Sequence, residues 1–300
     1  MQHSLRALSA ITVALICTSS GALAQSLPFS FGADGRIGAG YTDQVAGAGI
    51  FLFGDATSRL SLTNTAFGFE LGVYGLANAA DTPHETYGTF TYDFAQRGKL
   101  LAGVTRPAYD SFAVSAFDVM LPSVGIATTA ATRSQATYGA MFAGFLPYGL
   151  RYEATTDKMR FALSVATVPN RDTTIAGFGV AFPIGQLSFE SAVEVSRAAT
   201  TKVSGKVQLK GAIGAVKGGV GLYLPGTNGG PEMAEVFAAF SPVANTTIAG
   251  AAQVPLSGGV DPTLGLSARY DFSPVAGITV GLAQVGGADM AYSAHLDWNF

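Results

Sequence analysis

Apolar and polar residues alternate strictly along many segments of about ten residues in this chain. In residues 187–196, leucine, phenylalanine and valine fall only on odd positions, while serine and glutamate occupy most even ones. Residues 86–94, 203–210 and 264–272 alternate in a similar way. An α-helix, with its period of 3.6 residues, would mix the two sets, whereas a β-strand keeps them on opposite faces. The chain is therefore predicted to be all-β, with one apolar and one polar face on each strand.

The composition indicates what the apolar faces contact. Hydrophobic residues make up 48% of the chain and charged residues only 12%, about half the usual share in a globular protein. Beyond residue 24, no uninterrupted apolar stretch approaches the roughly 20 residues that a membrane helix needs. Because lipid offers the backbone no hydrogen-bond partners, only helices and closed barrels can span a bilayer. The predicted fold is a transmembrane antiparallel up-and-down β-barrel.

The first 24 residues have the pattern of a cleaved signal peptide. Arg6 supplies a positive charge, residues 7–17 are apolar, and residues 22–24 read Ala-Leu-Ala, which is a typical cleavage site. We expect a single barrel domain over residues 25–300. Cleavage removes Cys17, the only cysteine, so no disulfide is expected. The remaining 16 basic residues (17 less Arg6) and 20 acidic residues give a net charge of −4, which does not suggest a nucleic-acid partner.

The alternating pattern, followed along the chain, predicts sixteen strands. An even number places both ends of the barrel wall on the same side of the membrane. The predicted strands are 33–42, 57–64, 66–77, 85–95, 98–107, 148–156, 158–167, 173–182, 186–197, 201–211, 214–224, 232–241, 245–255, 262–272, 277–286 and 290–300.

The links between these strands fall into two groups. Short links rich in turn-forming residues are placed at the periplasmic end, at 96–98, 156–158, 183–185, 242–245 and 273–277. The intervening links are placed at the extracellular end, at 42–57, 78–85, 168–173, 225–231 and 256–262. One link, residues 108–147, is about forty residues long and shows little periodicity. A loop of that length in a compact domain is usually functional or disordered.

The last strand carries the most specific single signal. Tyr292, Ala294, Leu296, Trp298 and Phe300 share one face, and the opposite face is polar. An apolar, aromatic-rich last strand that ends in phenylalanine resembles the recognition signal of outer-membrane barrels. Together with the signal peptide, it predicts that the protein resides in the outer membrane.

Several stretches resemble the sixteen-stranded general diffusion porins of Gram-negative bacteria, especially the alphaproteobacterial type. These stretches are 31–41, 58–62, 67–72, 98–110 and 148–152, and the resemblance covers nearly all of the chain after residue 24 in order and spacing. It implies a homotrimer of water-filled channels in outer-membrane lipid, through which small hydrophilic solutes and ions diffuse. It further implies that the third loop, here 108–147, folds into the lumen and narrows it.

In that family, acidic residues of the loop face arginines of the wall across the constriction. On the wall, alternation directs Arg36, Arg59, Arg151 and Arg160 into the lumen, because a basic residue on the lipid face costs about 2–4 kcal/mol at mid-depth. On the loop, Asp110 and Asp118 are the only carboxylates and Arg133 is the only base. These seven residues are the predicted pore-lining and constriction residues. The loop has fewer acids than the family pattern, which puts a strong transverse field and cation preference in doubt.

Each of these assignments has a purely structural alternative. The wall arginines could simply pair with wall acids such as Glu70, Glu153 or Asp297. The two loop carboxylates could instead serve as hydrogen-bonding anchors for the loop.

Passive diffusion without chemistry is the favoured function, and two others remain open. One is an outer-membrane barrel enzyme of the lipase or protease type, and the other is a closed structural or adhesive barrel. No cofactor is expected, and no metal site, because His84 and His295 are far apart and lack further ligands. Small residues on the first and last strands, Ala39 and Ala294, are compatible with contact between subunits.

Overall fold

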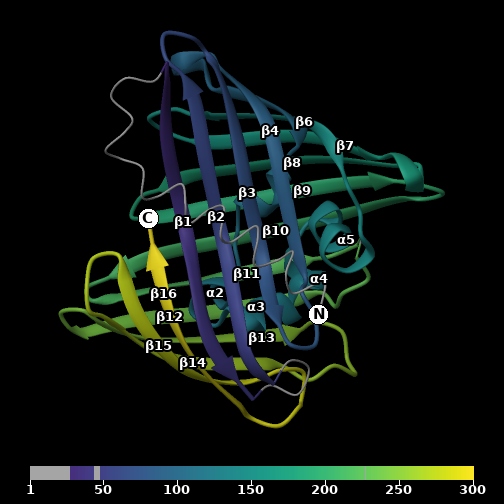
Figure 1. Ribbon diagram of the computed structural model, residues 1–300. Coiled ribbons are helices and arrows are strands. Elements are labelled where there is room, and N and C mark those ends of the chain that lie inside the picture. The colour runs from purple at the N-terminus through teal and green to yellow at the C-terminus, as the bar shows by residue number, and fades with distance from the viewer. Residues whose placement is uncertain (1–27, 44–47, 227) are drawn as a thin grey trace.

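A computed structural model of the protein describes residues 28–43, 48–226 and 228–300, and in these residues sixteen strands form one closed barrel. Every strand pairs antiparallel with its neighbours in sequence, and β1 pairs with β16 to close the ring (Figure 1). The expected signal peptide, 1–24, its cleavage site and the expected start of the mature chain lie outside the described residues.

The strands are between 6 and 14 residues long. They are β1 (Phe29–Thr42), β2 (Gly49–Leu62), β3 (Phe67–Asn78), β4 (His84–Asp93), β5 (Lys99–Val104), β6 (Tyr148–Thr155), β7 (Arg160–Val168), β8 (Thr173–Ile184), β9 (Leu187–Arg197), β10 (Thr201–Ile213), β11 (Val216–Leu224), β12 (Met233–Val243), β13 (Thr246–Pro255), β14 (Thr263–Asp271), β15 (Ala276–Gln284) and β16 (Ala291–Asn299).

The predicted all-β barrel is confirmed, and most predicted strand boundaries are correct to within two or three residues. One prediction was wrong: residues 49–56, assigned to an extracellular link, form the first half of β2. Most of this segment, residues 49–54, is apolar on both faces, because Phe51 and Phe53 point inward yet are shielded from water. Without a polar face, the segment lacks the alternation on which the prediction depended.

The two faces of the wall differ as the alternation predicts. Outward side chains are large, apolar and exposed, as a lipid-facing surface requires. Aromatic residues on this face are exposed: Tyr41, Phe69, Phe182, Phe272, Tyr292 and Trp298. Inward side chains are largely polar, and many of them are buried by a segment of chain inside the barrel, among them Glu190, Glu194, Lys206, Gln208, Glu235 and Gln253.

The C-terminus takes part in closing the ring. Seven residue pairs join β1 to β16, from Arg36 opposite Asn299 to Thr42 opposite Ser293. Beyond them, the backbones of Gly35 and Phe300 exchange two hydrogen bonds, each 3.1 Å long. The apolar last strand is therefore the element that pairs with β1 and closes the ring.

The link between β5 and β6 folds into the barrel, as predicted. It begins at Thr105, because β5 ends at Val104, three residues before Pro107, which has no amide hydrogen for a further ladder bond. We call residues 105–147 the inserted loop. Figure 1 shows its helices enclosed by the strands. They are η3 (Ala108–Ser111), α2 (Ala116–Met120), α3 (Pro122–Ala127), α4 (Thr129–Thr132) and α5 (Gln135–Ala143).

Two further short helices, η2 (Ala95–Arg97) and η4 (Pro169–Arg171), lie in the links β4–β5 and β7–β8. In the part of the chain that the structure describes, no helix has both the length and the hydropathy required to cross a bilayer.

If the outer face contacts lipid, the cost of a charge on that face depends on depth. Leu266 lies near the middle of β14, whereas Ile184 is the last residue of β8, and both are exposed. We expect Leu266→Arg to lower the free energy of unfolding by about 2–4 kcal/mol and Ile184→Arg by about 0–1 kcal/mol. Denaturant titration of barrels folded in lipid vesicles measures both values. Equal costs for the two variants would contradict a lipid-facing surface.

Candidate pore constriction

We call strands β9–β12 the far wall of the barrel. Carboxylates of the far wall hold the inserted loop at the N-termini of two of its helices. At α2, Glu235 of β12 accepts hydrogen bonds from the Ser115 hydroxyl at 2.5 Å and from the Ala116 amide at 3.1 Å. Ser115 is the N-cap of α2, and its hydroxyl also accepts from the Phe117 amide. An anion at a helix N-terminus satisfies free amides and interacts favourably with the helix dipole. Glu235 is therefore bound to the loop and is not free to line an open channel.

The same arrangement recurs at α5. Glu194 of β9 accepts from the hydroxyl of Ser134, the N-cap residue, and from the Gln135 amide at 2.8 Å. A third wall carboxylate, Glu190, accepts from the Ala113 amide at 2.8 Å.

Donors of the same wall bind carbonyl oxygens of the loop. Lys206 donates to the Thr132 carbonyl at 2.9 Å, and Gln208 donates to the Val114 carbonyl at 3.0 Å. Together with the carboxylates, these contacts fix the loop against β9–β12. The loop therefore covers that half of the lumen, and the space that remains open lies near β14, β16 and β1–β3.

Asp110, one of the predicted constriction residues, is buried inside the loop. Its carboxylate accepts from the Ser134 amide at 2.7 Å and from the Thr137 hydroxyl at 2.5 Å, and only 1% of the residue is exposed. These contacts join η3 to the start of α5. Asp110 thus has the anchoring geometry that was the alternative to a place in the constriction.

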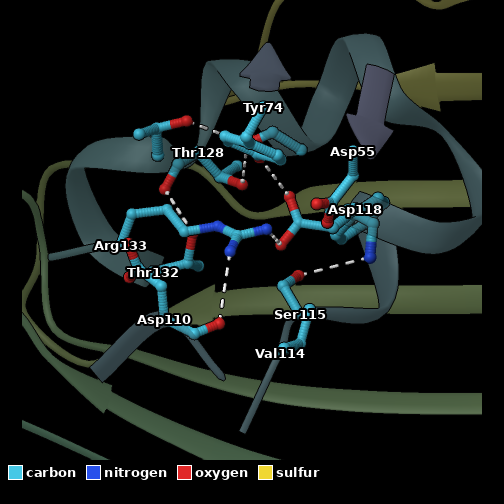
Figure 2. Close-up of polar contacts among 12 residues, drawn as sticks. Asp55, Tyr74, Asp110, Val114, Ser115, Asp118, Thr128, Thr132 and Arg133 are labelled. Atoms are coloured by element: carbon cyan, nitrogen blue, oxygen red, sulfur yellow. Dashed lines mark hydrogen bonds and ion pairs between the residues drawn. The ribbon is translucent and has the colours of Figure 1, made fainter. Parts of the chain in front are cut away.

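Asp118 and Arg133 form one buried cluster with Tyr74 of β3 (Figure 2). Asp118 is 2.8 Å from an Arg133 nitrogen and accepts from the Tyr74 hydroxyl at 3.1 Å. The guanidinium carbon lies 4.2 Å from the centre of the Tyr74 ring. Burial by itself lowers the pKa of Arg133, but Asp118, Tyr74 and Asp110 together outweigh burial and hold that pKa above its ordinary value. The cluster joins the loop to strands β1–β3, which we call the near wall.

An ion pair between the inserted loop and β2 was missed in the sequence. Arg106 donates to both carboxylate oxygens of Asp55 on β2, at 2.8 and 3.0 Å. Burial lowers the pKa of Arg106, but the Asp55 carboxylate, together with Tyr87 and Asp110, holds that pKa well above its ordinary value. Strict alternation would have placed Arg106 on the lipid face with Leu100 and Ala102, but it lies beyond the end of β5. Asp55 had been assigned to a link.

Arg36 lies on the inner face of β1, near the middle of the strand. It donates to Asp297 at 2.9 Å and to the carbonyl oxygen of Val119 on α2 at 2.5 Å, and it lies 2.8 Å from a ring nitrogen of His295. Arg269 of β14 binds the same Asp297 carboxylate, at 2.6 and 2.8 Å. Arg36 therefore contacts both the wall and the loop.

The other three wall arginines also lie on inner faces, and each has partners. Arg59 pairs with Asp34 and with Glu70. Arg151 binds Glu153 at 2.8 Å and three oxygen atoms of the loop root and η3. Arg160 donates to the Ser111 carbonyl at 3.1 Å and stacks on a loop ring, Phe112. Charges of opposite sign thus neutralise one another locally. They do not form a row of arginines facing a row of acids.

Open space remains on the near side of the loop. A cavity of about 780 Å³ lies toward the short turns β12–β13 and β14–β15, and one of about 360 Å³ lies at the opposite end, beside the link β3–β4. A cavity of about 240 Å³ lies between them and is bordered by Arg36, Asp118 and Arg133. A fourth, of about 160 Å³, is bordered by Arg59 and Arg151.

Solved porin structures share this architecture. A triple mutant of the Rhodopseudomonas blastica porin matches with a TM-score of 0.66 and 14% identity, and a second mutant of that porin matches with a TM-score of 0.66 and 15% identity. A third structure, described as "Asymmetric conductivity of engineered proteins", matches with a TM-score of 0.64 and 15% identity. Each match covers 91% of this chain and 100% of the other chain. The chain therefore has the sixteen-stranded porin fold.

No protein-family model matches the chain, and no curated protein matches its sequence.

Removal of a far-wall carboxylate should loosen the inserted loop. A hydrogen bond to a charged group contributes about 1.5–3 kcal/mol, so Glu235→Ala should speed amide exchange at the start of α2 by about tenfold or more. Hydrogen–deuterium exchange with mass spectrometry measures the rate. Glu232→Ala is the control, because Glu232 is exposed and lies in the preceding link. Unchanged exchange in Glu235→Ala would show that this carboxylate does not hold the loop.

Proposed function

We propose that the protein is an outer-membrane porin, a channel for passive diffusion of small hydrophilic solutes and ions. The observation that carries this proposal is the pairing of an apolar outer wall with a polar lumen that is narrowed by an inserted loop. Such a barrel excludes lipid outside and holds water within, so a solute can pass without contact with hydrocarbon. The similar structures support the proposal, since they include mutants of a porin and a structure described as "Asymmetric conductivity of engineered proteins".

The charged residues that border the remaining space are the proposed pore-lining residues. Arg36, Asp118 and Arg133 border the middle cavity, and Arg59 and Arg151 border the smallest one. For Arg160 and Asp110, which mainly hold the loop, we propose a positioning role. Local neutralisation of these charges favours weak ion selectivity, because a net transverse field needs separated charge.

We further propose that the protein acts as a homotrimer in the outer membrane, is exported by the signal peptide expected at residues 1–24, and catalyses no reaction. Support for the trimer comes from the resemblance to trimeric porins and from small outward residues near the closing strands, such as Ala39 and Ala294. The mass of the detergent-solubilised particle tests the assembly, and a monomeric mass contradicts the trimer. Hydrolysis of ester or peptide substrates by the purified barrel would instead support an outer-membrane enzyme.

Solute flux distinguishes a channel from a closed structural or adhesive barrel. Liposomes that contain the folded barrel should swell in isosmotic solutions of small sugars, and the rate should fall steeply with sugar size because the loop narrows the lumen. Heat-modifiable migration on gels verifies folding. Folded barrel that supports neither swelling nor conductance contradicts the proposed function.

A further inference from the structure

An apolar contact joins the near wall to the inserted loop in the middle of the barrel. Phe51 and Phe53 of β2 and Leu76 of β3 form a buried cluster, and Ile126 of α3 packs against it. The three wall side chains are only 1–7% exposed although they point into the lumen. We call Phe51, Phe53, Leu76 and Ile126 the apolar seam.

The seam lies between two cavities along the near wall. Leu76 and Ile126 border the cavity of about 360 Å³, and Phe53 and Ile126 border the one of about 240 Å³. Ile126 borders both, so a solute that moves from one cavity to the other passes this side chain. The seam is thus the boundary between the space at the β3–β4 end and the space in the middle of the barrel.

The wall half of the seam is rigidly placed. The Phe53 ring covers Gly38 of β1, where an added Cβ would come within 2.5 Å of ring atoms. The ring also packs edge-on against His295 at 5.1 Å between centres, and the Arg36 guanidinium lies 4.9 Å from its centre. Phe51 lies next to Phe53, with ring centres 6.0 Å apart.

The loop half of the seam is held from behind. Leu121 and Val124 pack with Phe117 and Met120 into an apolar cluster against the opposite side of the barrel, around Ala251 of β13 and Ala283 of β15. Pro122 and Ile126, four residues apart on the same face of α3, border the middle cavity on the other side. The α2–α3 segment therefore reaches across the lumen from one wall to the other, and Ile126 is its contact with the near wall.

We propose that the apolar seam is the selectivity barrier of the channel, and that it favours small uncharged solutes with an apolar face over hydrated ions. This inference rests on the proposed function and narrows the class of solutes. An ion at the seam loses water and gains no polar partner from these four side chains, and hydrophobic constrictions block ions in this way. A solute with an aromatic or aliphatic face can replace the contact of Ile126 with Phe51, Phe53 and Leu76 as it passes.

The test compares three barrels in bilayers and liposomes: wild type, Ile126→Ser and the control Val119→Ser. Val119 is an apolar loop residue that also borders the middle cavity, but its side chain is exposed and lies outside the seam. The measurements are potassium chloride conductance and liposome swelling rates with glucose and phenyl glucoside, a pair that differs by one apolar ring.

We expect Ile126→Ser to raise conductance by about threefold or more, and Val119→Ser to leave it nearly unchanged. In wild type, the ratio of the swelling rate with phenyl glucoside to that with glucose should exceed the ratio expected from solute size alone. In Ile126→Ser this ratio should fall. If Ile126→Ser merely loosened the loop, the potassium chloride conductance and both swelling rates would rise in proportion. That outcome overturns the proposal. Equal conductance in all three barrels, with solute flux intact, also overturns it. Barrels that pass neither ions nor sugars in any variant contradict the proposed function itself.

Discussion

The hydrogen bonds between β1 and β16 are the constraint on which the rest of the structure depends. A sheet in lipid cannot leave an edge unpaired, because each free amide or carbonyl group there has no partner. The seven residue pairs between these strands, and the Gly35–Phe300 bonds beyond them, join the first strand to the last. Once the ring is closed, the two-residue period assigns every side chain to lipid or to the interior.

Closure also creates an interior that must be filled or hydrated, and this chain does both. The inserted loop fills the half near β9–β12, where Glu194 and Glu235 bind the N-termini of α5 and α2. These two carboxylates therefore hold the inserted loop in place. Toward the near wall, the loop makes two kinds of contact, ion pairs and the apolar seam. The open space lies between these contacts. The shape of the passage is set by side chains of the loop as much as by the strands.

The sequence was informative about the fold because each strand's two faces meet different surroundings, and it failed where they do not. The residues around Phe51 and Phe53 were missed because the inserted loop shields their inner face from water. Alternation also predicted the inward direction of the wall arginines. Their partners could not be predicted in the same way, since contacts such as Arg106 with Asp55 join residues distant in sequence. Nor could the burial of Asp110, which depends on how the loop folds on itself.

Closure of the barrel can be tested directly by cross-linking its first and last strands. Ala39 and Leu296 are opposite each other in the β1–β16 pair, and cysteines at paired positions lie within reach of a disulfide. The only natural cysteine, Cys17, belongs to the expected signal peptide. In isolated membranes, oxidation of the double variant Ala39→Cys/Leu296→Cys should give a disulfide within one chain, whereas each single variant should not. Failure to form that intrachain disulfide in folded protein would contradict the closed barrel.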